Sequence, residues 1–146
     1  MIVVSRNRQS RPVLGVRALR RVAEVAFKAA GRGPGAVGVA FVDDEQMTGF
    51  HSDFLHKPTT TDVLSFPGAA DGVDDDDPDY RGDVVVCTDQ AARTARELGI
   101  PYHAELVVLT LHGVLHLLGY DHTCDGGVMT RLEETLRPVV LRGAVR

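Results

Sequence analysis

The chain has 146 residues, of which 44% are hydrophobic and 25% are charged, with 15 glycines and 7 prolines. This length suits one domain, and the composition excludes collagen-like, coiled-coil and wholly disordered chains. Two cysteines, Cys87 and Cys124, are too few for a disulfide scaffold. No apolar N-terminal run resembles a signal peptide, and the longest nearly uncharged apolar stretch, 106–120, is too short to span a bilayer. We therefore expect a single domain over residues 1–146, located in the cytoplasm and independent of membranes.

The charge is distributed unevenly along the chain. The formal net charge of −4 taken alone argues against a nucleic-acid partner. Residues 1–33, however, hold 8 of the 16 basic residues and a single acid, a net charge of +7. Such asymmetry is typical of a segment that binds nucleic acid or a membrane surface, but it is also typical of a helix with a solvated arginine face. Charge alone leaves both interpretations open.

Hydrophobic periodicity predicts five helices and three strands. Apolar residues at three- and four-residue steps predict an amphipathic helix over 13–30, with Pro12 in its opening turn and Gly31 after its end. The later predicted elements, in chain order, are a strand over 36–42, a helix over 45–56, a strand over 62–67, an exposed aspartate-rich loop over 68–80, a strand over 83–87, a helix ending at Leu98, a helix over 102–118 and a helix over 129–141.

The boundaries of these helices carry their own predictions. Asp43 or Asp44 is expected to cap the second helix, and Thr88 or Asp89 the third. Pro138 is expected to kink or interrupt the last helix. The order of elements predicts an α+β fold, a small mixed sheet packed by about five helices, with no internal repeat.

Three histidines at metal-ligand spacing dominate the second half of the chain. His112 and His116 are four residues apart on a predicted helix, so they share one face. Gly119 can end the helix, and His122 can then reach back as a third ligand. Three protein ligands leave a tetrahedral ion one open position, as in catalytic zinc sites. The alternative is a set of hydrogen-bonded core histidines, which the repeated spacing disfavours, so we expect a metal site on this central helix and the turn after it.

The residues around the histidines limit which reactions a metal site here can catalyse. A metalloprotease of the His-Glu-x-x-His type carries its general base after the first histidine, but here that position is Gly113. Peptide hydrolysis is therefore disfavoured. Asp121 can orient a ligand imidazole or cap the turn, and His103 is either a distant member of the active face or a solvated histidine.

At this point the sequence resembles a known family. The segment 112–122, HGVLHLLGYDH, is similar to the signature of the YbeY endoribonucleases, the bacterial ribosomal RNA maturation factors. The segments 61–67, TDVLSFP, and 82–86, GDVVV, resemble two strands of that family, and Met129 and Glu133 resemble its pattern in the last helix. The similarity extends over most of the chain from about residue 37 onward.

The resemblance implies a function and a ligand set. It implies a single-strand-specific, metal-dependent endoribonuclease that acts in ribosomal RNA processing, at the 3′ end of 16S RNA, and in ribosome quality control. It also implies one zinc ion per chain, bound by His112, His116 and His122. Ribosomal RNA and the small ribosomal subunit are the implied partners, and no DNA partner is expected. A basic groove around the metal is expected to hold the RNA.

One departure from the family pattern concerns phosphate binding. Many members carry an arginine several residues before the TDVLSFP strand, and this chain has none there. Lys57 or His56 can substitute as a cation, and Lys57 is the candidate retained, although lysine lacks the planar fork of arginine. Ser65 is a candidate phosphate contact or a plain strand-end hydroxyl, and the RNA-binding candidates in the basic segment are Arg17, Arg20 and Arg21.

The sequence leaves the catalytic group and two other functions open. The general base is unassigned, with His103, Lys57 and Asp121 as candidates. The attacking group is either a water or the RNA 2′-hydroxyl. One alternative function is an RNA-binding ribosome-assembly factor with a structural metal. The other is a metal-dependent hydrolase of a different substrate.

Overall fold

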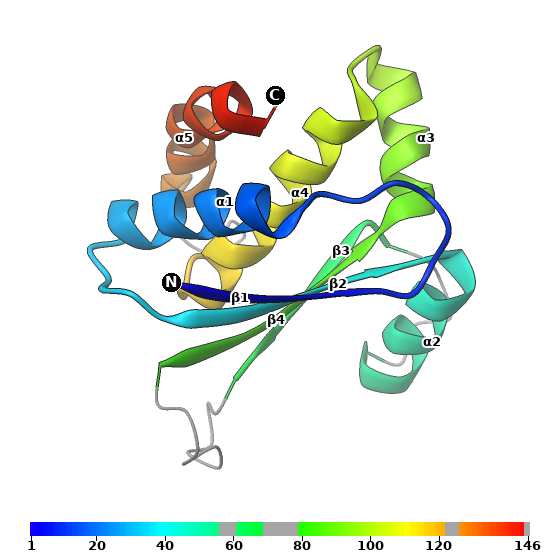
Figure 1. Ribbon diagram of the computed structural model, residues 1–146, viewed down its shortest axis with the longest axis horizontal. Coiled ribbons are helices and arrows are strands. Elements are labelled where there is room, and N and C mark those ends of the chain that lie inside the picture. The colour runs from blue at the N-terminus through cyan, green and yellow to red at the C-terminus, as the bar shows by residue number, and fades with distance from the viewer. Residues whose placement is uncertain (56–60, 69–78, 122–125, 145–146) are drawn as a thin grey trace.

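The computed structural model describes residues 1–55, 61–68, 79–121 and 126–144 (Figure 1). Its helices and strands, in chain order, are β1 (Ile2–Asn7), α1 (Val16–Ala29), β2 (Ala36–Val42), α2 (Asp44–Leu55), β3 (Val63–Pro67), β4 (Tyr80–Cys87), α3 (Thr88–Leu98), α4 (Tyr102–Leu117) and α5 (Val128–Ala144). The predicted aspartate-rich loop falls largely on residues 69–78, outside the described residues.

The four strands form one mixed sheet in the order β1-β2-β4-β3. β1, β2 and β4 run parallel, while β3 pairs antiparallel with β4 and forms one edge. The predicted α+β fold, with a small mixed sheet and five helices, is confirmed. The antiparallel edge matters for the site, because β3 reaches the protein surface beside α4.

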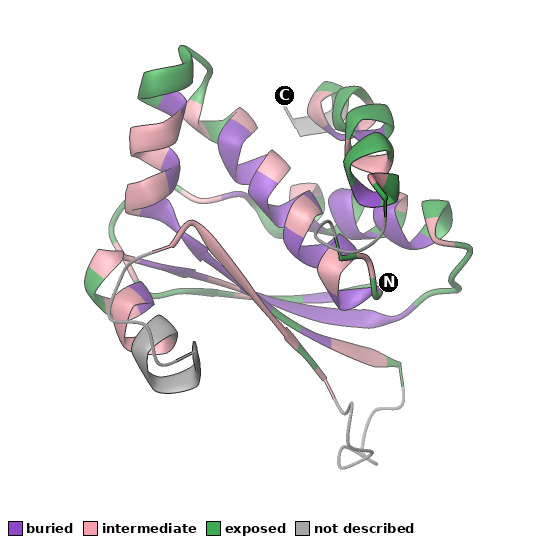
Figure 2. Cartoon of the chain, turned by 180° about the vertical axis from the view of Figure 1, so that it is seen from behind, coloured by how far each residue is buried: buried purple, intermediate pink, exposed green. Residues whose placement is uncertain are grey.

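The two faces of the sheet are covered unequally. α1, α3, α4 and α5 lie on one face, whereas α2 alone lies on the other, at one end (Figure 1). α4 is the central helix of the covered face and is buried along most of its length (Figure 2). Leu106, Val114 and Leu115 are fully buried there. Among the described helices none has the length and apolar composition of a membrane span by itself, and only α3 and α4 meet that test as a pair, bent by 118°.

The structure adds a strand that the pattern did not predict. β1 pairs with β2 in parallel from Ile2 opposite Ala36 to Asn7 opposite Phe41. Its sequence is short and ends in polar residues, and its exposed side carries Ile2 and Val4, 62% and 54% exposed, so alternation gives little signal. Long-range pairing with β2 rather than local pattern makes this segment a strand.

Two helix boundaries differ from the prediction. α1 begins at Val16 with Gly15 at its N-cap, so Pro12 precedes the helix instead of lying in its first turn. α5 continues as one helix through Pro138, so of the two effects expected there, a kink or an interruption, the interruption is wrong. Pro138 lies on the exposed side of α5, where water can satisfy the carbonyl group that the missing N–H leaves without its helical bond.

The predicted caps are right for α2 and wrong for α3. Asp43 Oδ1 accepts from the backbone N–H of Gln46 at 2.9 Å, and Gln46 Oε1 accepts from the backbone N–H of Asp43 at 3.1 Å. This reciprocal pair is a capping box. α3 has Cys87 at its N-cap and no side-chain cap bond. Thr88 instead lies within hydrogen-bond distance of Gln9 and of the Val42 carbonyl oxygen, at 2.7 and 3.2 Å.

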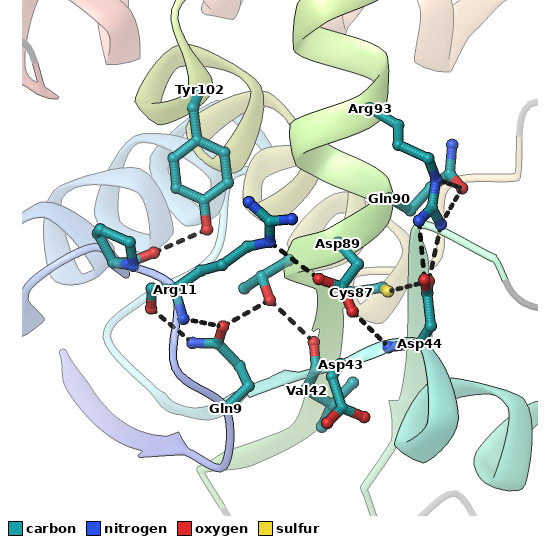
Figure 3. Close-up of polar contacts among 12 residues, drawn as sticks. Gln9, Arg11, Val42, Asp43, Asp44, Cys87, Asp89, Gln90, Arg93 and Tyr102 are labelled. Carbon is teal, nitrogen blue, oxygen red and sulfur yellow. Dashed lines mark hydrogen bonds and ion pairs between the residues drawn. The ribbon is translucent and has the colours of Figure 1, made fainter.

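Asp89 belongs to a polar cluster at the carboxyl ends of the parallel strands (Figure 3). Arg11 Nε donates to Asp89 Oδ1 at 2.8 Å, and the backbone N–H of Asp44 donates to Asp89 Oδ2 at 2.9 Å. These two hydrogen bonds, that from Arg11 first, lower the pKa of the Asp89 carboxyl. Arg93 binds both oxygens of Asp44 at 2.7 Å. The cluster joins the segment after β1 to the starts of α2 and α3.

Candidate metal centre

The second half of α4 and the edge strand β3 form a cleft. It has a volume of about 670 Å³ and is lined by Thr61, Asp62, Val63, Leu64, Ser65, Pro67, His112, His116, Gly119, Tyr120 and Asp121. Both histidines are half-buried, on the side of α4 that faces β3. The cleft therefore presents two imidazoles to solvent from a rigid, deeply packed helix.

Gly113 is what lets α4 approach the sheet closely here. A Cβ atom at this position would lie 2.4 Å from Val84 Cγ1 and 3.3 Å from Ser65 Oγ. The Ser65 hydroxyl donates to the Gly113 carbonyl oxygen at 2.9 Å. His-Glu-x-x-His proteases carry a glutamate at this position. Here α4 packs so closely against the sheet that no side chain fits at residue 113.

The Nε2 atoms of the two imidazole rings face each other. His112 Nε2 and His116 Nε2 are 3.0 Å apart, and the rings meet edge to face with centroids 4.6 Å apart. His112 Nδ1 is hydrogen-bonded to Glu133 Oε1, and His116 Nδ1 to the Tyr120 carbonyl oxygen at 2.9 Å. A carbonyl and a carboxylate both accept, so these partners assign the proton of each neutral ring to Nδ1. Each Nε2 then carries a lone pair.

This arrangement fits a divalent metal. Two lone pairs that face each other at 3.0 Å repel, and a shared cation removes the repulsion. Two nitrogens bound to one tetrahedral zinc ion at about 2.0–2.1 Å lie roughly 3.3 Å apart, close to the separation found here. Within residues 1–55, 61–68, 79–121 and 126–144, no three His, Cys, Asp or Glu side chains converge on one point. The third predicted ligand, His122, lies outside this part of the chain.

Glu133 is the site residue that sequence reasoning missed. It projects from α5 and binds His112, and its side chain is only 16% exposed. The fully buried Met129, one turn earlier, anchors the same helix in the core. A carboxylate on the far nitrogen of a ligand histidine fixes the orientation and the tautomer of the ring. The sequence signal was present, since Glu133 matches the family pattern, but nothing in one sequence placed α5 beside His112.

The other predicted site residues are divided between the cleft and the surface. Asp121 and Ser65 line the cleft, and Asp62, which the sequence pattern did not single out, lines it too. Because the Ser65 proton is donated to Gly113, this hydroxyl has no proton left to donate to a phosphate.

His103 is exposed near the start of α4, its ring 5.8 Å from that of Tyr102, and it does not line the cleft. Lys57 lies outside the described residues.

The three candidate RNA-binding arginines lie on α1. Arg17, Arg20 and Arg21 are all exposed, and none of them lines the cleft. Arg21 Nη2 donates to the Val139 carbonyl oxygen of α5 at 3.3 Å. The structure thus places this basic face on the helical side of the sheet, and RNA binding there stays a prediction.

Comparison with known proteins gives the family. The family model described as Endoribonuclease YbeY matches residues 7–137. Proteins named Endoribonuclease YbeY from Geobacter sulfurreducens and Koribacter versatilis are 39% and 43% identical, over 92% and 77% of this chain and 89% and 68% of theirs. A solution structure from Thermotoga maritima shares the fold, with a TM-score of 0.65 at 23% identity over 97% of this chain and 91% of that one. The chain belongs to the YbeY endoribonuclease family.

Proposed function

We propose that this protein is a zinc-dependent endoribonuclease that cleaves single-stranded RNA. Its setting is ribosomal RNA processing in the cytoplasm, including maturation of the 3′ end of 16S RNA, and ribosome quality control, with the small ribosomal subunit as partner. The observation that carries the proposal is the pair of facing Nε2 atoms, 3.0 Å apart, in an open cleft of a chain of this family.

His112 and His116 would hold the zinc ion together with His122. When bound, zinc supplies a Lewis acid that polarises a phosphoryl oxygen and acidifies a water molecule. Glu133 and the Tyr120 carbonyl keep the Nδ1 protons in place, so that both Nε2 atoms stay available as ligands. The protein's contribution here is to orient the two rings before substrate arrives.

The cleft also contains carboxylates for proton transfer. Asp62 and Asp121 line it from the start of β3 and from the turn after α4. Either carboxylate can accept a proton from an attacking water or 2′-hydroxyl. No Lys or Arg is found among the residues that line the cleft in the described chain. The cation that balances the phosphate charge would then come from Lys57 or from the metal itself.

Gly113 supports RNA over peptide as the substrate. A glutamate there, the general base of zinc proteases, would clash with Val84 in this packing. Phosphodiester cleavage does not need a base at that position, because the RNA 2′-hydroxyl or an activated water on the open side of the cleft can attack.

Metal removal and substrate form test the proposal directly. The purified protein is stripped with a chelator, reconstituted with one equivalent of zinc, and assayed on a single-stranded RNA and on the same sequence as a duplex. We expect cleavage of the single strand only, lost on stripping and restored by zinc. Equal cleavage of both RNAs, or activity that survives stripping, contradicts the proposal.

A further inference from the structure

The face of the sheet opposite the metal helix carries a groove of its own. It has a volume of about 680 Å³ and is lined by Val4, Arg6, Arg8, Gly38, Val39, Ala40, Val42, Phe50, Phe66, Tyr80, Asp83 and Val85. All four strands contribute lining residues, and α2 contributes Phe50. α2 lies on this face of the sheet, at one end (Figure 1). The groove shares no lining residue with the metal cleft.

The groove is deep over β2 because the residues at its centre have small side chains. Gly38 and Ala40 lie in the middle of β2, between β1 and β4. The Asp83 carboxylate lies over Gly38, where a Cβ atom would be 2.0 Å from Asp83 Oδ1. Any larger residue at position 38 would therefore displace Asp83 and fill the groove.

One wall of the groove is aromatic. Phe50 of α2 and Phe66 of β3 lie with ring centroids 6.3 Å apart at 46°, and Tyr80 lines the groove from the start of β4. All three side chains are half-buried, so part of each ring faces the groove. Aromatic rings on a sheet surface are platforms on which unpaired nucleic-acid bases stack.

The other wall is cationic. Arg6 and Arg8 are exposed and come from the end of β1 and the residue after it. Among the described residues neither guanidinium has an ion-pair partner, whereas Arg11 and Arg93 nearby are bound to Asp89 and Asp44. Both belong to the basic segment 1–33 with its charge of +7. A partner with spaced negative charges and flat apolar groups complements the two walls better than a purely apolar one.

β3 places this groove next to the metal cleft. Neighbouring residues of a strand point to opposite faces, and here Ser65 lines the cleft while Phe66 lines the groove. β3 is the last strand of the sheet, so a chain leaving the cleft crosses only its edge to reach the other face.

We propose that this open face is a second binding site for the same RNA, in which unpaired nucleotides flanking the scissile bond stack on Phe50, Phe66 and Tyr80 and place phosphates on Arg6 and Arg8. The inference rests on the proposed function and adds to it a substrate-length requirement. The bases of a duplex are paired and stacked on one another and cannot stack on these rings, so the site also favours single strands. Asp83 accepts hydrogen bonds from base amino groups or 2′-hydroxyls on the floor.

The test compares Arg6→Gln/Arg8→Gln with wild type on a tetranucleotide and on an oligouridylate of about 20 nucleotides. The expected result is a KM for the long RNA raised about tenfold, an unchanged kcat, and unchanged cleavage of the tetranucleotide. Arg32→Gln/Arg96→Gln, two exposed arginines outside the groove, is the charge-matched control and should behave as wild type. Tyr80→Leu should weaken long-RNA binding at least fivefold while leaving the melting temperature near that of wild type.

Binding of the long RNA by zinc-free protein separates this inference from the proposed function. Fluorescence anisotropy of labelled oligouridylate needs no cleavage, so it reports on the groove even if no RNA is cut. Weaker binding by Arg6→Gln/Arg8→Gln, with the slope of log K against log salt reduced by about 1.4, supports the groove. Equal binding by both double variants overturns the inference. Equal reductions in affinity for the short and the long RNA overturn it as well.

Discussion

Glu133 of α5 holds the Nδ1 atom of His112 of α4, so the candidate metal centre is built across two helices. The contact joins residues 21 positions apart in the chain, and both side chains are largely shielded from solvent. It leaves His112 Nε2 facing His116 Nε2. The orientation of the first ligand therefore depends on how α5 packs, and not on α4 alone.

Loss of this carboxylate is expected to weaken metal binding. Glu133→Ala should lower zinc affinity about 10- to 100-fold, because the His112 ring loses the partner that fixes its orientation and its Nδ1 proton. Glu133→Gln retains an acceptor oxygen and should lose less. Zinc affinity is measured by competition with a chromogenic chelator. Glu134→Gln, an exposed neighbour on the same helix, is the control, and equal affinity in all four proteins would exclude the positioning role.

Gly113 is expected to be indispensable for packing. Gly113→Ala should destabilise the fold by about 1–3 kcal/mol, since the new methyl group overlaps Val84. A Cβ atom at Gly49 in α2 would meet no atom of another part of the described chain within 4 Å, so Gly49→Ala should be neutral or stabilising by about 0.5–1 kcal/mol. Urea unfolding gives both values. If Gly113→Ala is as stable as Gly49→Ala, the close approach of α4 to β4 is wrong.

Asp89 is expected to make stability depend on acid pH. Its pKa is lowered in the folded protein, chiefly by the hydrogen bond from Arg11. The stabilisation is therefore present above the unfolded-state pKa and is lost as the pH falls through the folded-state pKa. The stability difference between wild type and Asp89→Asn should shrink on acidification below about pH 4. Glu97→Gln, at the exposed end of α3, is the control, and a difference for Asp89→Asn that does not vary with pH would contradict the argument.

The arginines of α1 are expected to contribute to the binding of ribosomal RNA or the small subunit through their positive charge. Arg17→Gln/Arg20→Gln/Arg21→Gln should weaken binding to ribosomal RNA or the small subunit, and the salt slope should fall by about 0.7 for each phosphate that is no longer neutralised. Arg21 also contacts Val139, so the melting temperature of the variant is checked first. An unchanged affinity at low and high salt would mean that these arginines form only a solvated helix face.

The sequence predicted the elements whose pattern is local. The α4 helix, the strands β2 and β3 and the Asp43 cap follow from periodicity and turn chemistry, and the structure has them. β1 was missed because its strand character comes from pairing with β2. The expected α3 cap failed for a similar reason, since Asp89 is bound by Arg11 and Asp44 from other parts of the chain.

Within the site, too, local sequence pattern predicted some residues and missed those that long-range packing brings in. The i, i+4 spacing predicted that His112 and His116 share a face, and their rings do meet in the cleft. Glu133 and Asp62 reach the site from α5 and the start of β3, and no local pattern places those segments beside α4. Long-range packing, which one sequence does not reveal, brings the β3 side of the cleft against α4.

The central claim is that the facing histidines bind the metal that RNA cleavage needs. The most direct measurement is zinc content and single-strand cleavage of His116→Ala beside His103→Ala, with both purified in parallel with wild type. We predict that His116→Ala loses zinc and cleavage together while it remains folded, and that His103→Ala, whose ring lies outside the cleft, retains both. A His116→Ala protein that still cleaves single-stranded RNA at the wild-type rate would contradict the account.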